Sequence, residues 1–502
     1  MARNQIHDTL IIGAGFSGLG AAIKLTEAGI DDIVIVERSD RVGGTWRDNT
    51  YPGVACDIPS ILYSYSFVRN PSWTRVYPSG AEIQAHIEDV TDRFGLRQRI
   101  RFDTEVTALT FDGDAGAWTV TTQARKTKVR RIFRARTVVM AAGPLADHTF
   151  PDIRGIESYT GHKIHSAAWD HDYDFTGKRV AVIGTGASAV QIVPELVKTA
   201  QFVKVFQRTA GWVLPRLDTE VPAAVRALFG KVPATQDLAR QALFWAHEAS
   251  ATALVWKSPL TSLVARLAKA HLNSTVADPW LRRQLTPDFT PGCKRMLVSS
   301  DYYPALQQDN CKLISWPIAT LSPAGIRTSD GIEHHLDAIV FATGYDVHLS
   351  GPPFPVTGLG GRTMGAEWAG HAQAYKSSSV HGYPNLFLMS GPNSGPGHNS
   401  LLVYVEGQLD YAVAGITTIL RDDLRYLDVR ADVQARYNST IQRRLTKTTW
   451  MSGCTSWYLT EDGFNASMYP GFATQYLRQM RDFRFGDYTA AARRAQARAV
   501  HV

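Results

Sequence analysis

A chain of 502 residues is too long for one small core, so we expect two or three domains. Its composition, 44% hydrophobic and 20% charged, is typical of a globular protein. The net charge of +7 would suit a nucleic-acid partner, but Lys and Arg are scattered. We interpret their densest cluster, residues 125–136, as an exposed hairpin, and expect no nucleic acid as a partner. An anionic, phosphorylated cofactor explains part of the positive surplus equally well.

The cysteines and the apolar segments bear on the cellular location. Cys56, Cys293, Cys311 and Cys454 form no Cys-x-x-Cys pair, which argues against a dithiol redox centre and against a metal site of the zinc type. We therefore expect reduced thiols in a cytoplasmic protein. The first eight residues run straight into a strand without an apolar signal region, and no run of 18 apolar residues predicts a membrane span.

A first dinucleotide-binding pattern opens the chain. The apolar segment 9–12 predicts a strand, Gly13-Ala-Gly15-Phe-Ser-Gly18 follows it, and residues 19–28 predict a helix. Gly13 permits the tight turn, Gly15 lets the backbone approach a pyrophosphate, and Gly18 lets helix and strand pack closely. Free N–H groups at the helix start suit the phosphates. With all parts in register, the pattern predicts a nucleotide site.

The next strand indicates which nucleotide binds. Residues 33–36 predict that strand, and Glu37 follows it, where a carboxylate accepts the ribose hydroxyls. An acid at this point favours a plain ribose, as in FAD or NAD. The segment 41–46, Arg-Val-Gly-Gly-Thr-Trp, resembles the second phosphate contact of two-domain flavoproteins, so we predict FAD.

A second pattern of the same kind begins at a predicted strand, residues 178–183. Gly184-Thr-Gly186-Ala-Ser-Ala189 opens a helix to about residue 199, and the small Ala189 is tolerated in place of the third glycine. The following strand, 202–206, ends without an acid, and Arg208 can face a 2′-phosphate there. We therefore predict NADPH rather than NADH. Two nucleotide sites in one chain imply electron transfer from one dinucleotide to the other.

The order of elements predicts an α/β fold with two Rossmann-like dinucleotide-binding domains, for FAD and NADPH, and a helical insertion. We expect the FAD domain in residues 1–148, completed by 381–502, and the NADPH domain in 149–214, completed by 297–380. The insertion, 215–296, has apolar helical stretches at 225–229, 241–256 and 260–272, and is expected to cover the substrate entrance. Strands at 312–314, 326–328 and 338–342 are expected to return the chain to the second sheet.

The segment between the two fingerprints carries a family resemblance. It reads Tyr159-x-Gly161-x-x-x-His165-x-x-x-Trp169-Asp170, and with it the chain resembles the type I Baeyer–Villiger monooxygenases over nearly its whole length. Three further stretches match patterns of that family, at residues 44–57, 141–144 and 341–346. The related nitrogen- and sulfur-oxidising flavin monooxygenases usually lack the Trp-Asp ending.

The resemblance implies roles for individual residues. Arg295 matches the active-site arginine, and Asp57 matches the carboxylate that pairs with it. Lys294 matches a contact to the phosphate of the nicotinamide cofactor, beside Arg208 and Thr209. The remaining cofactor-binding positions that we predict from the motifs and the resemblance are Gly13, Gly15, Gly18, Glu37, Gly44, Thr45, Trp46, Tyr63, Val106, Gly184, Thr185, Gly186, Ala187, Ser188, Gln191 and Trp457. His165 and Trp169 are expected to serve the hinge between the domains and the position of the cofactor rather than the chemistry.

The implied reaction starts with hydride transfer from NADPH to FAD. Reduced flavin adds O2, and the flavin C4a-peroxide anion attacks a ketone, so that one oxygen atom is inserted beside the carbonyl and an ester or lactone forms. An always-cationic guanidinium suits both the peroxide anion and the developing oxyanion. From the residues alone, Arg295 and Asp57 could equally form a structural ion pair.

Other functions fit the sequence less well. The runner-up is a flavin monooxygenase that oxidises nitrogen or sulfur, which would need less from Arg295. A disulfide reductase is disfavoured by the missing Cys-x-x-Cys, and a hydrolase by the missing Gly-x-Ser-x-Gly elbow. A binding protein with degenerate nucleotide sites predicts damaged fingerprints, whereas both are nearly intact.

The Gly/Pro-rich loop 391–400 precedes a predicted helix, 401–419, whose start could meet the flavin or its pyrophosphate. His398 in this loop is a candidate site residue, although a lone loop histidine is more often structural. The sequence leaves the oligomeric state open, and with it the class of ketone, whether linear, cyclic, aryl or steroidal.

Overall fold

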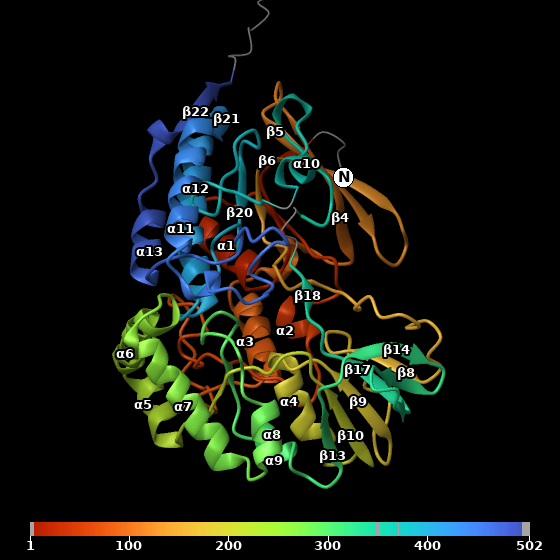
Figure 1. Ribbon diagram of the computed structural model, residues 1–502. Coiled ribbons are helices and arrows are strands. Elements are labelled where there is room, and N and C mark those ends of the chain that lie inside the picture. The colour runs from red at the N-terminus through yellow and green to blue at the C-terminus, as the bar shows by residue number, and fades with distance from the viewer. Residues whose placement is uncertain (1–4, 348–351, 370, 494–502) are drawn as a thin grey trace, which may run out of the picture.

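Two sheets built around parallel strands organise the chain, and helices cover their faces (Figure 1). The structure is a computed structural model that describes residues 5–347, 352–369 and 371–493. Residues 1–4 and 494–502, at the two ends of the predicted FAD domain, lie outside the described residues.

The larger sheet has the order β19-β4-β5-β6-β1-β2-β3, and β20 also pairs with β6. Strand β1 pairs parallel with both β2 and β6, whereas β4, β5 and β6 form an antiparallel meander. The Ile-Val-Ile-Val sequence of β2 is buried throughout, as expected for a central parallel strand that is covered on both faces. The strands are β1 (Ile6–Ile12), β2 (Ile33–Val36), β3 (Ile100–Arg101), β4 (Thr104–Asp112), β5 (Ala117–Ala124), β6 (Arg130–Met140), β19 (Val356–Thr357) and β20 (Leu386–Leu388).

The smaller sheet is entirely parallel, in the order β13-β10-β9-β17-β8. Its core strand β17 is buried along its whole length. The strands are β8 (His162–His165), β9 (Arg179–Ile183), β10 (Phe202–Phe206), β13 (Cys311–Ile314) and β17 (Ala338–Phe341).

Helices surround each sheet and form a separate group on one side, labelled α5 to α7 in Figure 1. Helix α1 packs against α11 beside the larger sheet, and α4 follows β9 of the smaller one. The helices are α1 (Phe16–Glu27), α2 (Thr45–Asp48), α3 (Gly80–Arg93), α4 (Ala187–Leu196), α5 (Ala223–Lys231), α6 (Pro233–Leu254), α7 (Pro259–Thr275), α8 (Pro279–Gln284), α9 (Tyr302–Ala305), α10 (Met364–Trp368), α11 (Leu401–Arg421), α12 (Ala431–Leu445) and α13 (Ala473–Arg481).

Shorter pairings complete the architecture. The remaining strands are β7 (Asp147–His148), β11 (Val213–Leu214), β12 (Leu297–Val298), β14 (Ile318–Ser322), β15 (Gly325–Thr328), β16 (Glu333–His335), β18 (Tyr345–Asp346), β21 (Leu424–Val429) and β22 (Tyr488–Ala492). Single 3₁₀ turns lie at Arg97–Arg99, Leu359–Gly361, Thr449–Met451 and Phe485–Asp487. Among the described residues, no helix is both long and apolar enough to cross a membrane.

The structure confirms the α/β class and the basic hairpin, which is β5 and β6. It corrects the expectation for residues 326–328. These residues form β15, which pairs antiparallel with β14 and β16 in a sheet of its own, instead of joining the parallel sheet. Short apolar strands look alike in sequence, and the choice of partner depends on residues elsewhere.

Two further observations bear on the domain limits and the thiols. Strand β19 lies within residues 297–380, which we assigned to the NADPH domain, yet it pairs with β4 of the larger sheet. The exact domain limits remain a prediction.

The expectation of reduced thiols throughout is wrong, because Cys293 and Cys454 form a disulfide. These cysteines are 161 residues apart in sequence, so their spacing gives no sign of their contact.

Candidate active site

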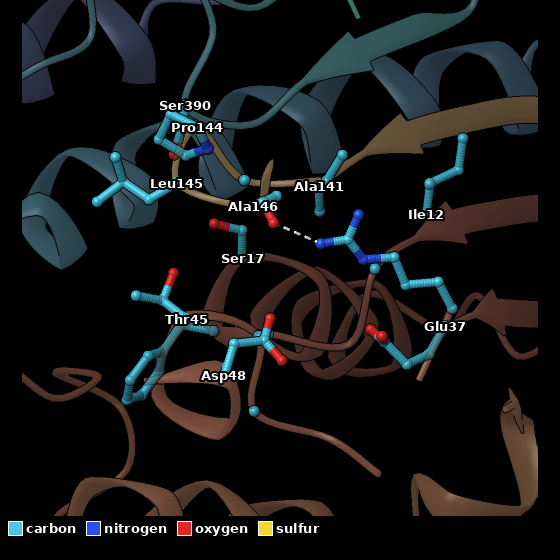
Figure 2. Close-up of a pocket in the computed structure, with 18 of the residues that line it drawn as sticks. Ile12, Ser17, Glu37, Thr45, Asp48, Ala141, Pro144, Leu145, Ala146 and Ser390 are labelled. Atoms are coloured by element: carbon cyan, nitrogen blue, oxygen red, sulfur yellow. Dashed lines mark hydrogen bonds between the residues drawn. The ribbon is translucent and has the colours of Figure 1, made fainter. Parts of the chain in front are cut away.

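The first candidate site is a cavity of about 460 Å³ at the carboxyl ends of β1 and β2. Figure 2 shows Ser17, Thr45, Asp48 and Glu37 around this cavity, with Ala141 to Ala146 on its opposite side. The predicted residues that line it are Gly13, Gly15, Glu37, Gly44, Thr45, Trp46, Tyr63 and Val106. The first fingerprint therefore lies at the carboxyl ends of the strands, where ligands bind in sheets of this type.

The glycines of this fingerprint are required by close backbone approaches. A Cβ on Gly18 would lie 1.9 Å from the carbonyl oxygen of Gly13, and one on Gly13 would lie 2.5 Å from that of Ala141. Gly18 does not line the cavity but lets α1 pack against β1. Helix α1 has no side-chain cap and no acid in its first turn, so its N–H groups are available to an anion.

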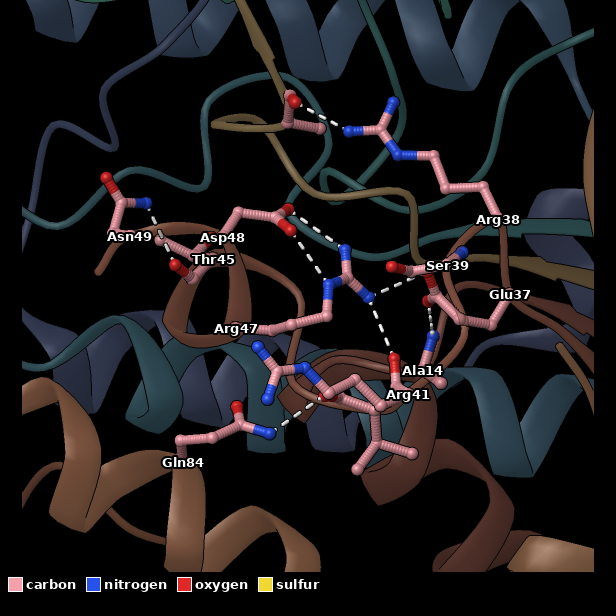
Figure 3. Close-up of polar contacts among 12 residues, drawn as sticks. Ala14, Glu37, Arg38, Ser39, Arg41, Thr45, Arg47, Asp48, Asn49 and Gln84 are labelled. Atoms are coloured by element: carbon pink, nitrogen blue, oxygen red, sulfur yellow. Dashed lines mark hydrogen bonds and ion pairs between the residues drawn. The ribbon is translucent and has the colours of Figure 1, made fainter. Parts of the chain in front are cut away.

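Glu37 is held by a buried polar network, drawn in Figure 3. Its Oε2 accepts from the N–H of Ala14 at 2.8 Å, and its Oε1 accepts from that of Ser39 at 2.9 Å. Arg47 donates to Oε1 at 2.8 Å and also pairs with Asp48. The side chains of Glu37 and Arg47 are each only 5% exposed. This fixed carboxylate is suited to binding ribose hydroxyls.

Arg47 is a residue that the sequence reasoning missed. Burial opposes its charge, but the bonds to Asp48 and Glu37 outweigh this effect and raise the pKa of Arg47 above its ordinary value. Arg47 lies within the Gly44-to-Asp57 pattern, ten residues after Glu37. This position is the sequence signal that points to it.

The second candidate site is a cavity of about 1440 Å³ between the two sheets. The second fingerprint lines it, together with Thr45 and Trp46, α6 of the insertion and the C-terminal segment around Trp457. The two cavities share Thr45, Trp46 and Tyr63 as lining residues, so they adjoin. A group bound in one cavity can therefore meet a group bound in the other, as electron transfer between two dinucleotides requires.

The second fingerprint forms one wall of this larger cavity. Gly184 adopts φ +120°, and a Cβ on it would lie 2.4 Å from the carbonyl oxygen of Ala342. Gly186, by contrast, has open space where a Cβ would lie, which leaves room for a pyrophosphate. Helix α4 begins directly after it and has no side-chain cap. The cavity is also lined by Thr185, Ala187, Ser188, Gln191 and Thr209.

Two cations converge in this cavity, and neither forms an ion pair of 4.0 Å or less among the described residues, although the charge of Asp288 partly offsets that of Arg208 at Lys294. Arg208 is exposed to it, and Lys294 lies close enough for the two charges to interact. Burial lowers the pKa of Lys294 below its ordinary value, and the charge of Arg208 lowers it further. Such crowding of like charges is unfavourable unless an anion binds between them, and a phosphate has the required charge.

Arg295 and Asp57 meet inside the same cavity. The Nη2 of Arg295 donates to Asp57 Oδ2 at 2.6 Å and to Oδ1 at 2.8 Å, and its Nε donates to Oδ2 at 3.0 Å. Half of the arginine side chain is exposed, on the side of the cavity that it lines. The Asp57 carboxylate raises the pKa of Arg295 well above its ordinary value despite the cost of burial. Arg295 therefore presents a permanent positive charge to the cavity.

Aromatic residues line the region where the two cavities adjoin. The Nε1 of Trp46 donates to the hydroxyl of Tyr63 at 3.1 Å, and their rings pack edge to face. Trp457 is 48% exposed on the wall of the larger cavity. The amide of Gln191 binds Tyr51 and the backbone of Ala55, so it ties α4 to the loop that carries Asp57.

The segment 159–170 contributes structure rather than a reacting group. A Cβ on Gly161 would lie 2.2 Å from the hydroxyl of Tyr159, which explains the glycine. His165 ends β8 and stacks on His148, and burial, helped by His148, lowers its pKa to about 4. Trp169 stacks on Phe175. Trp169 and Phe175 pack on the core of the smaller sheet, and the hinge role of this segment remains a prediction.

His398 is buried and binds Glu248 of α6 at 3.2 Å. The sequence reasoning named His398 but missed this partner, which lies 150 residues away. The loop 391–400 borders the larger cavity, and Leu401, the first residue of α11, lines both cavities.

Known proteins resemble this chain in sequence and in fold. Residues 7–225 match the family described as FMO-like, flavin-binding monooxygenase-like. A Baeyer–Villiger monooxygenase of Streptomyces coelicolor is 41% identical, with 97% of this chain and 93% of that protein covered. One of Pseudomonas aeruginosa is 40% identical, with 94% and 89% covered. The structure of a steroid monooxygenase bound to NADP superposes with a TM-score of 0.85 at 28% identity, covering 97% of this chain and all of that one.

Proposed function

The chain belongs to the family of Baeyer–Villiger monooxygenases, and on that premise we propose that Arg295 and Asp57 form the centre at which a ketone is oxygenated. The protein is an FAD- and NADPH-dependent enzyme that inserts one oxygen atom of O2 beside a ketone carbonyl and gives an ester or lactone. The observation that carries the proposal is the Arg295–Asp57 pair inside the cavity between the two dinucleotide units.

The residues of the first cavity fit FAD. The uncapped start of α1 and the absence of a side chain at Gly15, which faces Gly44 across the cavity, suit the pyrophosphate, and the fixed carboxylate of Glu37 suits the ribose. Trp46, Tyr63 and Val106 would line the flavin. When bound, the flavin accepts hydride from NADPH and activates O2, and the chain supplies position and charge.

The residues of the second cavity fit NADPH. Gly186 and the start of α4 would hold the pyrophosphate, and Arg208 with Lys294 would bind the 2′-phosphate. Trp457 would pack near the nicotinamide. The predicted roles of Thr185, Ala187, Ser188, Gln191 and Thr209 rest on their position in this wall.

In this proposal Arg295 stabilises negative charge that develops on the oxygen atoms of the reacting groups. A guanidinium remains cationic under burial, whereas a lysine amine could lose its proton. Asp57 fixes the guanidinium through three hydrogen bonds, so that little reorganisation is needed during the reaction. We assign substrate access to the insertion, because Ala246, His247 and Leu254 of α6 line the cavity.

Product analysis tests the proposed function. The purified protein is incubated with FAD, NADPH, air and a panel of linear, cyclic, aryl and steroidal ketones plus one thioether, and the products are identified by mass spectrometry. Ester or lactone formation supports the proposal. Sulfoxide as the sole product would favour the alternative, a flavin monooxygenase that oxidises sulfur or nitrogen.

A further inference from the structure

The disulfide between Cys293 and Cys454 lies beside the active site. Cys293 immediately precedes Lys294 and Arg295, and Cys454 precedes Trp457 and Tyr458 in the C-terminal segment. The bond therefore joins the segment that presents two cavity cations to the segment that presents the aromatic residues Trp457 and Tyr458 to the same cavity. The two cysteines are 161 residues apart in sequence, so the disulfide connects the two segments far more directly than the intervening chain does.

Close packing surrounds the bond. A Cβ on Gly292 would lie 2.7 Å from the carbonyl oxygen of Leu254 and 3.0 Å from the hydroxyl of Thr449. The N–H of Thr449 donates to the carbonyl of Val255 at 2.9 Å. The end of α6, the Cys293 segment and the start of the C-terminal segment thus meet at one corner, with Cys293 fully buried in it.

The two segments also meet on the cavity side of the bond. Tyr458 is buried beside the Arg295–Asp57 pair. Burial raises the pKa of Tyr458 to about 12, and the positive charge of Arg295 opposes this rise. The two segments are therefore linked by the disulfide and also by the electrostatic interaction of Tyr458 with Arg295.

We propose that this disulfide is a redox-controlled positioning device, which holds Lys294 and Trp457 in place for the nicotinamide cofactor when oxidised and releases them when reduced. Cys293 and Cys454 are positioning residues in this scheme, since they act through their neighbours. Opening the bond leaves the C-terminal segment attached at this corner only by noncovalent contacts. The side chains of Lys294 and Trp457 must then be ordered by the cofactor itself, which weakens its binding.

The redox chemistry balances with simple reactants. Formation of the bond removes two electrons and two protons from two thiols, and hydrogen peroxide, which a flavin oxygenase releases in unproductive turnover, accepts them and becomes two waters. A dithiol reverses the step by exchange, and is itself oxidised to a disulfide. Cys454 is partly exposed, so a small dithiol reaches the bond from that side.

The other two cysteines serve as internal controls. Cys56 and Cys311 are free and buried, and burial raises the pKa of each thiol, that of Cys311 to about 12. Both thiols therefore remain protonated and unreactive in the folded protein. Alkylation before and after treatment with a dithiol therefore distinguishes the free Cys56 and Cys311 from the bonded Cys293 and Cys454.

The first test maps the bond in the full-length protein that contains FAD. The air-oxidised protein is alkylated, digested without reductant and analysed by mass spectrometry. We expect Cys293 and Cys454 in one cross-linked peptide pair, and both alkylated only after reduction with dithiothreitol. Alkylation of both cysteines in the oxidised protein would overturn the proposal.

The second test measures NADP⁺ affinity by titration calorimetry, which requires no ketone turnover and so fails independently of the proposed function. Reduction with dithiothreitol should weaken binding about tenfold in the wild type, since two large side chains lose their order. Cys454→Ser should show the weak affinity with or without reductant, and Cys311→Ser should behave as the wild type. The visible FAD spectrum reports whether each variant folds. Equal affinity of the oxidised and reduced wild type would contradict the proposal.

Discussion

At the scale of single residues, we propose that charge decides which nucleotide the second site accepts. Gln207 follows β10 as Glu37 follows β2, and Arg208 stands one residue further on, so the second site has no acid at this strand end and has a cation beside it. A carboxylate there binds ribose hydroxyls and repels a phosphate, whereas a guanidinium attracts it. Lys294, brought in from the end of the insertion, adds a second cation that the local sequence around Arg208 does not contain.

Replacing Arg208 with alanine tests this assignment. A lost charge-assisted bond costs about 1.5–3 kcal/mol, so Arg208→Ala should raise the KM for NADPH about 10- to 100-fold. The KM for NADH should change little, because NADH has no 2′-phosphate. Steady-state kinetics with both cofactors measure the difference.

Arg131→Ala is the matched control, because it removes one positive charge from the exposed β6 of the hairpin. It should leave the preference for NADPH unchanged. An equal rise of the two KM values in Arg208→Ala would refute the phosphate contact.

The Arg47–Glu37 pair makes a second prediction at this scale. Removing one partner of a buried pair leaves an uncompensated charge, so Arg47→Ala should lower the free energy of unfolding by about 3–5 kcal/mol. It should also reduce the fraction of purified protein that retains FAD, since Glu37 loses its fixed position. Urea unfolding of the apoprotein and the absorbance ratio of flavin to protein measure the two effects.

Arg99→Ala provides the comparison for that pair. Its partner Asp31 is 74% exposed, and an exposed pair contributes less than about 1 kcal/mol. A similarly small loss in Arg47→Ala would mean that Glu37 does not depend on its ion pair.

At the scale of elements, a single carboxylate connects the insertion to the FAD-side helices. Glu248 of α6 accepts hydrogen bonds from the N–H groups of Ala473 and Thr474, at 3.0 and 2.9 Å, and from His398. It thereby caps the start of α13 from a distant helix, where the helix dipole favours a negative charge. The same residue fixes the loop that borders the cavity.

This contact predicts a pH dependence. Burial acts to raise the pKa of Glu248, but its hydrogen bonds from His398 and Thr474 outweigh this and lower it from 4.5 to about 2. The contribution to stability is therefore present above pH 4.5 and is lost as the pH falls towards 2. Glu248→Ala should cost about 1–3 kcal/mol in urea unfolding at pH 7, and this loss should shrink at pH values below the ordinary pKa.

Glu220→Ala is the control for that experiment. Its side chain is 86% exposed on the same insertion, so its removal should change the free energy of unfolding by less than about 0.5 kcal/mol. A loss in Glu248→Ala that stays constant from pH 7 to pH 3 would exclude the ionised cap.

At the scale of the whole molecule, the sequence predicts what is encoded locally. Each fingerprint is a continuous strand, turn and helix, and its first glycine is required by a close contact with the residue that follows a neighbouring strand, Ala141 after β6 or Ala342 after β17. This is why both nucleotide units, and the residues that line their cavities, are predictable from short patterns. The pairing of Arg295 with Asp57, 238 residues apart, came from the family resemblance, because spacing alone left a structural pair open.

Contacts between distant segments were the part that sequence reasoning missed. Glu248 binds residues 150 and 226 positions away, and Cys293 meets a cysteine 161 positions away. Neither partner follows a periodic pattern, since each contact exists only once the insertion packs on the C-terminal segment. The same holds for β15, a strand of four residues whose sequence does not indicate which sheet it joins.

In the function proposed above, Arg295 acts from the larger cavity in the oxygen-dependent half of the catalytic cycle. The most direct measurement is a single turnover of Arg295→Ala in a rapid-mixing spectrometer, with NADPH first and then O2 and ketone, followed by quantification of the ester. We expect NADPH to bleach the bound flavin at a rate near that of the wild type, whereas the ester yield should fall at least about 100-fold because a stabilising charge is removed. Ester formation at the wild-type rate would contradict this role of Arg295. Loss of flavin reduction would assign Arg295 to cofactor binding instead.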